Sequence, residues 1–235
     1  FIPFDFGSSV ADIEQGPGGL IYLAIDGTYP ALSNPERKGG GVLVIDIDNP
    51  LNTVSIDTSF LSYYTSSSSN RPYIVVKDLE FDREGNLWVA NAFSTNKNAP
   101  IHVKSPDGNW KSYGSSETQI KISQSPISLS FDSWNRPWFG AFKAEEANLG
   151  TYPDGGIFGL TVEGKPYQPE NFLWESVLTN TTVWSIAFGK NNRLFYLTPT
   201  GLNYYDIVIG GDSFGQNLYS YFPNISFGGG SKIEI

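Results

Sequence analysis

Three features of the sequence predict an all-β fold. The first is its composition, in which 6 Trp, 13 Tyr and 16 Phe accompany 25 Gly and 15 Pro, so strand formers alternate with turn formers. The second is a hairpin phrase that occurs four times along the chain. The third is a series of short apolar runs without a sustained period of 3.6, which argues against a helical or α/β fold.

The hairpin phrase is clearest in residues 76–93, VKDLEFDREGNLWVANAF. An apolar strand leads into the turn at residues 82–86, and a second apolar strand follows at once. Gly85 and Asn86 tolerate the positive φ that tight hairpin turns require. This stretch therefore predicts two antiparallel strands joined by a short turn.

Three further copies of the phrase lie at residues 10–24, 128–140 and 185–196. The first copy precedes residues 76–93 by 66 positions, and the third and fourth follow at steps of 50 and 57. Each copy carries an aromatic residue shortly after its turn, namely Tyr22, Trp88, Trp138 and Phe195. Such regular recurrence indicates a repeat architecture.

Each hairpin is followed by sequence suited to two more strands. These segments are 41–46 and 51–56, 100–104 and 110–113, 156–161 and 172–178, and 202–206 and 218–222. Four short antiparallel strands per unit, repeated every 47 to 66 residues, are the pattern of a β-propeller built of four-stranded antiparallel blades.

We expect residues 1–235 to form a single propeller domain or segment. The predicted blades cover approximately residues 6–60, 74–122, 125–178 and 182–223, and residues 225–235 repeat the opening strand of a unit. A closed four-bladed ring needs four innermost strands, and this chain offers five. The sequence therefore predicts at least four blades belonging to a larger propeller of six to eight blades, within a longer chain or assembly.

Composition narrows the partners and the compartment. The formal net charge is −9 and no basic run is present, so nucleic acid is not an expected partner. No apolar run approaches the ~20 residues that cross a bilayer, so membrane insertion is not expected. Cys and Met are both absent and the chain begins at Phe1, which suggests a processed or partial chain. We expect an extracellular, cell-surface or periplasmic location.

The repeat resembles a known family at residues 82–91, DREGNLWVAN. This stretch is similar to the two-component-regulator propeller repeat, whose core is an aspartate, a Gly-Asn turn, Leu-Trp and a strand that ends in small residues. The first copy departs from it with Gly19-Leu20 and Tyr22, and the third with Asn135-Arg136-Pro137 in the turn.

Residues 221–235, YFPNISFGGGSKIEI, resemble blade junctions of PorZ-like cell-envelope propellers of type IX secretion in Bacteroidota. These resemblances imply sensing, docking or adhesion. The repeat is also similar to virginiamycin-lyase-like propellers, which supply an enzymatic alternative.

Most aromatic residues have a structural interpretation. We expect the four that follow the turns to pack between adjacent blades, because large rings cement sheets stacked face to face. Trp134 and Trp184 fall outside that repeated position. Exposed aromatics of this kind are candidates for stacking on sugars or on partner side chains.

Four carboxylates alternate along two predicted innermost strands, namely Asp12, Glu14, Asp78 and Glu80. Innermost strands line the channel of a propeller, so these groups, with Glu234, could hold a cation such as a structural calcium ion. The alternative is that they accept hydrogen bonds from the neighbouring blade or pair with Lys77 and Lys232. We expect the second arrangement, and no cofactor.

His102 is the only histidine, so any histidine-dependent acid–base chemistry rests on it. It lies in an alternating run and is expected on a polar strand face. In the lyase alternative it would be the general base.

Two long connections, residues 60–73 and 143–154, exceed the usual length of hairpin loops and favour a binding role. Tyr next to Ser and Asn is typical of adaptable binding surfaces. The candidate partner-binding residues of these loops are Tyr63, Tyr64, Arg71, Tyr73 and Tyr152, in addition to Trp134 and Trp184.

The sequence thus favours a non-catalytic binding module of an exported or cell-surface protein that recognises a protein or a glycan through its inter-strand loops. Two alternatives stay open. One is a lyase or hydrolase that uses His102, and the other is a purely structural spacer in an envelope assembly.

Overall fold

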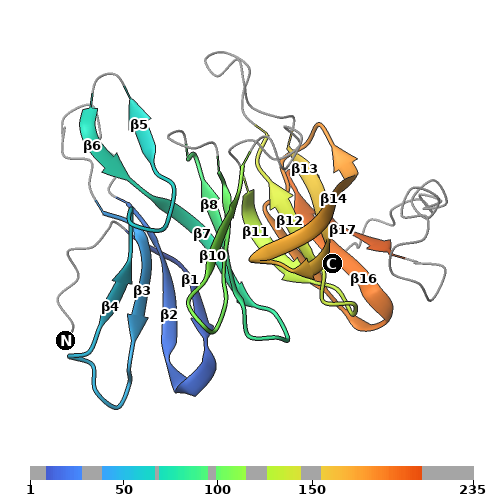
Figure 1. Cartoon of the computed structure of the whole chain (residues 1–235). Coiled ribbons are helices and arrows are strands. Elements are labelled where there is room, and N and C mark those ends of the chain that lie inside the picture. The colour runs from blue at the N-terminus through green and yellow to red at the C-terminus, as the bar shows by residue number, and fades with distance from the viewer. Residues whose placement is uncertain are drawn as a thin grey trace.

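Four blades follow one another along the chain and lie side by side in space (Figure 1). A computed structural model describes residues 9–27, 39–66, 69–94, 99–114, 126–143 and 155–207. Strands that are consecutive within a blade pair in antiparallel fashion. The chain has a β-propeller fold, as the sequence predicts.

The strands of the first two blades are as follows. Blade 1 consists of β1 (Ser9–Gln15), β2 (Ile21–Asp26), β3 (Gly41–Ile45) and β4 (Val54–Ile56). Blade 2 consists of β7 (Val75–Phe81), β8 (Leu87–Ala92), β9 (Ile101–Lys104) and β10 (Trp110–Tyr113). A single bridging pair, Asp26 with Val75, joins these two blades into one hydrogen-bonded sheet.

Blades 3 and 4 form separate sheets. Blade 3 consists of β11 (Pro126–Phe131), β12 (Pro137–Ala141), β13 (Gly156–Lys165) and β14 (Gln168–Thr179). The described strands of blade 4 are β15 (Ser185–Phe188), β16 (Arg193–Thr198) and β17 (Gly201–Asp206). The predicted strand at 218–222 and the further blade predicted from residue 225 lie outside the described residues.

The innermost strands β1, β7, β11 and β15 lie next to one another in that order. In β1, β7 and β11 the pairing register shifts at equivalent points, for example between Val76 and Asp78. Such a β-bulge inserts one extra residue, so Val76 and Leu79 point to the same face although they are three positions apart. The repeat therefore conserves backbone irregularity as well as sequence.

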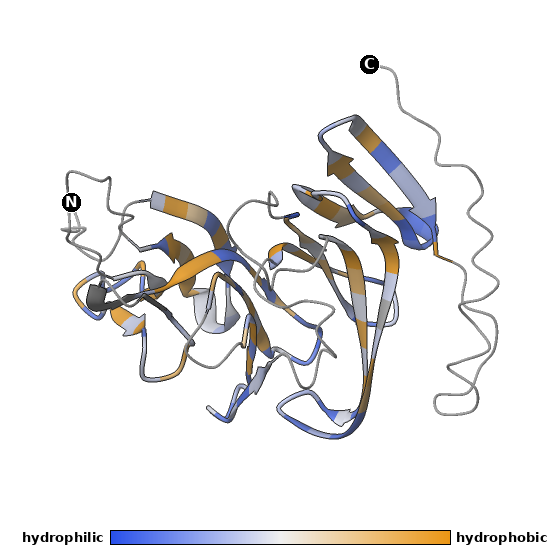
Figure 2. Ribbon diagram, turned by 90° about the horizontal axis from the view of Figure 1, so that it is seen from above, coloured by the Kyte–Doolittle hydropathy of each residue, from blue (hydrophilic) through white to orange (hydrophobic). Residues whose placement is uncertain are grey.

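Three hydrophobic cores lie between successive blades. The first joins Tyr22 of blade 1 to Leu79 of blade 2, and the second surrounds Trp88 with residues of blades 2 and 3. The third surrounds Trp138 with residues of blades 3 and 4. Figure 2 shows hydrophobic residues concentrated in the strands that form these cores. The expected packing of Tyr22, Trp88 and Trp138 between blades is confirmed.

Two features extend beyond the repeat. A small hairpin, β5 (Tyr64–Ser66) and β6 (Ser69–Tyr73), lies within the long connection between blades 1 and 2 (Figure 1). In blade 3, β13 and β14 run for 10 and 12 residues, so their hairpin is longer than the predicted segments 156–161 and 172–178. Two short 3-10 turns, η1 (Pro17–Gly19) and η2 (Lys190–Asn192), connect strands in blades 1 and 4. None of the helices in the described ranges is long and apolar enough to cross a membrane.

Candidate inter-blade binding pocket

The turn between β7 and β8 is organised by Asp82, which is largely buried. Its Oδ1 accepts hydrogen bonds from the backbone N–H groups of Glu84 and Asn86, at 3.1 and 2.8 Å. Its Oδ2 accepts from the Asn86 side-chain amide at 2.7 Å and from the Trp88 indole Nε1 at 3.0 Å. One carboxylate thereby fixes both the turn and the inter-blade indole.

Asp132 plays the same part in the turn between β11 and β12. Its Oδ1 accepts from the backbone N–H groups of Trp134 and Arg136, and its Oδ2 accepts from the Trp138 Nε1 at 3.0 Å. Arg136 replaces the amide of Asn86, because its Nε donates to Asp132 Oδ2 at 2.7 Å. This pair is nearly buried.

Blades 1 and 4 use a different residue at this position. Their turns begin with Gly16 and Gly189, and their aromatics are Tyr22 and Phe195. A Cβ atom on Gly16 would lie 2.3 Å from the Tyr22 ring, and one on Gly189 would lie 2.9 Å from the Phe195 ring. These rings occupy the space that the carboxylate fills in blades 2 and 3.

Neighbouring turns are linked to one another on one face of the propeller. The Arg83 backbone N–H donates to Asn135 Oδ1 and its Nη1 donates to the Ser133 carbonyl, both at 3.0 Å. The Asn135 amide donates to Glu84. The Ser133 N–H continues the row by donating to Asn192 Oδ1 at 2.8 Å. The turns of blades 2, 3 and 4 therefore form one connected surface.

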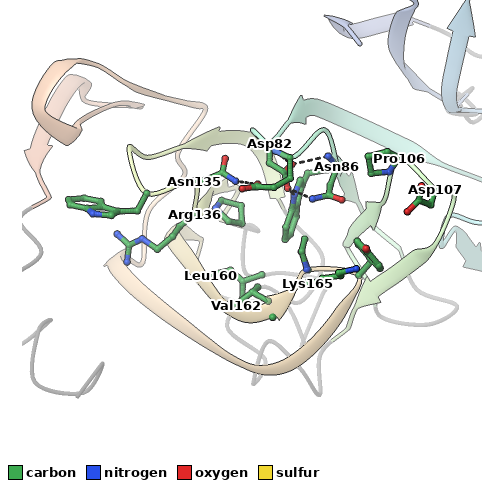
Figure 3. Close-up of a pocket in the computed structure, with 16 residues that line it drawn as sticks. Asp82, Asn86, Pro106, Asp107, Asn135, Arg136, Leu160, Val162 and Lys165 are labelled. Carbon is green, nitrogen blue, oxygen red and sulfur yellow. Dashed lines mark hydrogen bonds between the residues drawn. The ribbon is translucent and has the colours of Figure 1, made fainter. Parts of the chain in front are cut away.

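A pocket of about 520 Å³ opens on this surface between blades 2 and 3 (Figure 3). Its wall comes from four hairpins, β7–β8, β9–β10, β11–β12 and β13–β14, which contribute their turns and the strand residues beside them. The lining residues are Asp82, Glu84, Asn86, Trp88, Pro106, Asp107, Trp134, Asn135, Arg136, Pro137, Leu160, Val162, Gly164, Lys165, Pro166 and Tyr167. This volume lies within the usual range for small-molecule sites.

The long β13–β14 hairpin closes one side of the pocket. The Tyr113 hydroxyl of blade 2 donates to the Pro166 carbonyl at the hairpin tip, at 2.6 Å. The Tyr113 ring meets Phe172 and Trp174 edge-on, with ring centroids 5.9 and 6.1 Å apart. Because this hairpin reaches across the blade boundary, both blades contribute to one wall.

The chemistry of the lining is mixed. Trp134 is 49% exposed although its indole is large and apolar. The Arg136 guanidinium lies between Trp134 and Trp138, at 5.6 and 5.4 Å from their ring centroids, which is a cation–π distance. Lys165 lies 5.6 Å from the Tyr167 ring centroid. Aromatic faces thus lie next to exposed carboxylate and ammonium groups.

The predicted partner-binding residues do not form one site. Trp134 lies in a turn at the carboxyl end of β11, whereas Tyr73 and Trp184 lie within two residues of the amino ends of the innermost strands β7 and β15. An innermost strand of seven residues spans roughly 20 Å, so the two groups belong to opposite faces. Figure 1 likewise shows the β5–β6 hairpin at the opposite end of the sheets from the β1–β2 turn.

The tyrosines of the first long connection pack against other parts of the protein. Tyr73 is buried, and its ring lies 4.9 Å from that of the half-buried Tyr64. Tyr63 packs against the core between blades 1 and 2. Trp184 is 48% exposed and contacts Phe142. Arg71 lies in β6 with a side chain outside the described structure, and Tyr152 lies outside the described residues.

Two of the four carboxylates of β1 and β7, Asp12 and Asp78, link adjacent blades. Asp12 Oδ2 accepts from the Leu79 backbone N–H at 3.1 Å, and Asp78 Oδ2 accepts from the Leu129 backbone N–H at 2.6 Å. Lys77 pairs instead with Asp26, at 2.5 Å. This is the hydrogen-bonded arrangement expected from the sequence. Among the described residues, no group of three or more acidic or histidine side chains is placed to hold a metal ion.

Burial perturbs these carboxyl groups. It raises the pKa of Asp78 to about 8, with a further contribution from the neighbouring Asp12 charge, although the Leu129 N–H opposes the change. Burial also raises the pKa of Glu80 to about 8, assisted by Glu14 and Asp12. Burial also raises the pKa of Glu14, and the neighbouring Asp12 charge raises it further. The protonated forms of Asp78 and Glu80 are therefore favoured near neutral pH.

His102 is fully buried and lies away from the pocket. Its Nε2 faces the Ser62 backbone N–H and the Asn91 amide, both at 3.3 Å, and its Nδ1 lies 2.8 Å from the Ser112 hydroxyl. A backbone N–H can only donate, so Nε2 is the acceptor and Nδ1 carries the proton. The ring ties β9 to β10 and to the connection after blade 1.

Sequence reasoning identified Trp134 and missed most of the pocket. Asn86 and Asp107 lie in five-residue turns, and Lys165 and Tyr167 lie at the tip of the β13–β14 hairpin, all in sequence that reads as ordinary connections. They meet only because the four turns project from the same face of two blades. The one available signal was the shared direction of these turns in a propeller repeat.

No protein-family profile matches the chain, and no curated protein matches it in sequence. Solved structures do match. PorZ, described as an essential bacterial surface component of the type-IX secretion system of Porphyromonas gingivalis, is similar with a TM-score of 0.57 and 12% identity, over 86% of this chain and 26% of PorZ. The extracellular domain of the one-component system BT4673 from B. thetaiotaomicron has a TM-score of 0.52 and 14% identity, over 86% of this chain and 22% of its own.

A catalytically inactive virginiamycin B lyase from Staphylococcus aureus, solved with quinupristin, is also similar. The TM-score is 0.50 with 14% identity, over 87% of this chain and 58% of the lyase. At these identities the similarity establishes the shared fold. The chain spans about a quarter of the length of PorZ and of the BT4673 domain.

Proposed function

We propose that this chain is a non-catalytic β-propeller module of an exported or cell-surface protein and that it binds a glycan in the pocket between blades 2 and 3. Two of the similar solved structures are described as a bacterial surface component and as an extracellular domain, which supports the location. The burial of His102 supports a binding role over a lyase that depends on this residue.

The observation that carries the glycan assignment is Trp134, half exposed at the mouth of a pocket lined by polar groups. The C–H faces of a sugar ring are apolar and pack on aromatic rings, whereas its hydroxyl groups need hydrogen-bonding partners around the ring edge. Glu84 and Asp107, both exposed, provide carboxylate partners of that kind.

Charge favours a neutral glycan. Asp82 is committed to its turn and Arg136 to Asp132. The exposed charges that remain are two carboxylates, Glu84 and Asp107, and one ammonium group, Lys165. A surface with both signs and no basic excess lacks the cluster of cations that a strongly anionic polysaccharide would need.

Trp134→Ala tests this assignment against a matched control, Trp184→Ala. Both tryptophans are about half exposed, but they lie on opposite faces. We expect an array of neutral, amino and uronic-acid oligosaccharides to give binding of neutral chains by the unaltered protein. Trp134→Ala should weaken that binding by roughly tenfold or more, because an aromatic anchor is worth at least about 1.4 kcal/mol.

Trp184→Ala should leave the affinity unchanged, and both variants should keep the melting midpoint of the parent within about 2 °C, since both side chains are surface residues. Equal loss of binding in the two variants, or no binding to any neutral oligosaccharide, would contradict the assignment.

A protein partner at the opposite face is the second candidate. The exposed Trp184 and the half-buried Phe142 form an aromatic pair there, beside the connections that precede the innermost strands. Trp184→Ala should then reduce retention of the chain on the surface of the cells that produce it, whereas Trp134→Ala should not. Retention that responds only to Trp134 would exclude this candidate.

A further inference from the structure

Blade 1 has an open face whose equivalent is covered in every other blade. Val10 and Ile13 of β1 are 43% and 63% exposed. Leu79, Leu129 and Ile186 occupy the position of Ile13 in the other copies, and they are 1%, 5% and 6% exposed. This position is therefore buried in blades 2, 3 and 4 and exposed only in blade 1.

The other positions on this face follow the same rule. Val76 and Val183, which match Val10, are fully buried. On the second strand, Ile21 and Leu23 are only half-buried, whereas their counterparts in blade 2, Leu87 and Val89, are buried. Four apolar residues on two strands of blade 1 thus lack the cover that their equivalents have.

In blades 2, 3 and 4 the equivalent face packs on an aromatic residue of the preceding blade. The face of blade 2 packs on Tyr22 of blade 1, the face of blade 3 on Trp88 of blade 2, and the face of blade 4 on Trp138 of blade 3. In each interface the preceding blade contributes the aromatic residue that follows its first turn. The interface repeated in this chain is thus between one blade's aromatic and the next blade's innermost strand.

In blades 2 and 3, a backbone N–H at the edge of the innermost strand bonds to the preceding blade. The N–H groups of Leu79 and Leu129 donate to Asp12 and Asp78 of the preceding blade. Leu79 is paired with Val89, Leu129 with Phe139 and Ile13 with Leu23, all in the same register. Residues opposite one another in such non-hydrogen-bonded pairs direct their N–H groups away from the partner strand. The N–H of Ile13 therefore points away from β2, off the edge of β1 that borders the open face of blade 1.

We propose that the open face of blade 1, formed by Val10, Ile13, Ile21 and Leu23, is a docking surface for one further propeller blade. That blade presents an aromatic residue to Ile13 and an acidic side chain that accepts the Ile13 backbone N–H. The same kind of interface is already present three times in the molecule, and this docking surface is independent of the glycan pocket.

Hydrogen exchange tests this proposal directly. The backbone amides of residues 9–15 are compared in the protein purified from the cells that make it and in the isolated 235-residue chain. We expect exchange at Ile13 to be at least tenfold slower in the cell-derived protein, because a buried and hydrogen-bonded amide exchanges only on opening. Equal exchange rates in the two samples would overturn the proposal.

Two other occupants give different results. If a second copy of this chain covers the face, protection of Ile13 appears in the isolated chain and grows with protein concentration. If residues 1–8 cover it, protection appears in the isolated chain at every concentration and is lost on deletion of those residues. Either result would replace the proposed blade.

A pair of variants gives an independent measurement in the cell-derived protein. Ile13→Asn should lower the melting midpoint by roughly 5 °C or more, as expected for a polar group placed in an interface between blades. Leu51→Asn is the matched control, because Leu51 is 96% exposed in the turn after β3, and it should change the midpoint by less than about 1 °C. Equal shifts for the two variants would show that Ile13 faces solvent.

Discussion

Asp82 and Asp132 perform two tasks that usually fall to different residues. Each closes a tight turn by accepting backbone N–H groups, and each accepts the Nε1 proton of an indole six residues later. An indole buried between blades needs an acceptor, since an unpaired buried donor costs about 1–3 kcal/mol. The carboxylate therefore couples the geometry of the hairpin to the core between the blades.

Asp82→Ala should lower the free energy of unfolding by about 3 kcal/mol, because it removes the acceptor of Trp88 and of three turn donors. Asp107→Ala, in an exposed turn nearby, should change it by less than about 0.5 kcal/mol. Urea unfolding measures both. In Trp88→Phe, which has no donor, Asp82→Ala should cost less; an undiminished cost would show that the indole bond contributes little.

At the scale of single residues, the sequence predicted the turn and the position of Trp88 but not the hydrogen bond between Asp82 and Trp88. The recurrence of Asp, Gly-Asn and Trp indicated a hairpin, and the spacing placed Trp88 between blades. It could not show that Asp82 bonds to Trp88, because that contact depends on the rotamers of both side chains. Likewise, the repeat gave no sign that Tyr73 would be buried, since its burial depends on the β5–β6 hairpin folding back onto blade 2.

Among the elements, the β13–β14 hairpin departs most from the repeat. Its length carries the turn at Pro166 over the edge of blade 2, where the Tyr113 hydroxyl bonds to it. The Tyr167 and Lys165 side chains at its tip line the pocket. The sequence indicated strands here but could not give their length, because residues 162–171 are polar enough to read as a loop.

Tyr113→Phe should destabilise the protein by about 1 kcal/mol, the typical net value of one hydrogen bond, since the ring and its contacts with Trp174 stay in place. It should also weaken binding of a neutral oligosaccharide severalfold, because one pocket wall loses its anchor. Thermal unfolding and titration calorimetry report the two effects. Unaltered affinity alongside the loss of stability would show that the hairpin tip does not shape the pocket.

Across the whole molecule, innermost strands are joined by carboxylates that pass from one blade to the next. Asp12 reaches blade 2 and Asp78 reaches blade 3, while Glu14 and Glu80 follow on the same strands. Lys77, which precedes Asp78 in β7, is paired with Asp26. The four carboxylates are half-buried and close enough to affect one another's charge, so ionisation of all four groups opposes close packing of blades 1 and 2.

Stability should therefore fall as the pH rises. The pKa values of Asp78 and Glu80 are about 8 in the folded protein, against ordinary values near 4 in the unfolded chain. The folded state binds more protons between about pH 4 and pH 8, so the free energy of unfolding decreases across that window. The melting midpoint should drop by several degrees between about pH 5 and pH 9.

Asp78→Asn isolates this effect, because an amide oxygen can still accept the Leu129 N–H but cannot ionise. The variant should show a flatter dependence of melting midpoint on pH, with the largest gain over the parent at high pH. A variant curve that runs parallel to that of the parent would assign the pH dependence to other groups.

For the pocket between blades 2 and 3, the repeat predicts where the turns lie but does not predict the cavity between them. The repeat predicts that turns gather on one face, and it identified Trp134 as exposed. It does not predict a cavity of about 520 Å³, because a cavity depends on how far adjacent blades splay and on the reach of one long hairpin. Fold and packing are distributed over many positions, whereas the site rests on a few side chains from four separate turns.

The exchange of aspartate for glycine at the first turn position constrains how these blades can vary. In blades 2 and 3 a carboxylate partners an indole, and in blades 1 and 4 a bare α-carbon accommodates a different ring. Any route between the two arrangements requires a pair of changes. If only the aromatic residue changes, a buried carboxylate loses its indole donor. If only the turn residue changes, either its side chain clashes with the ring or the indole N–H has no acceptor. We therefore expect substitutions at the first turn position and at the aromatic position of a blade to occur in pairs.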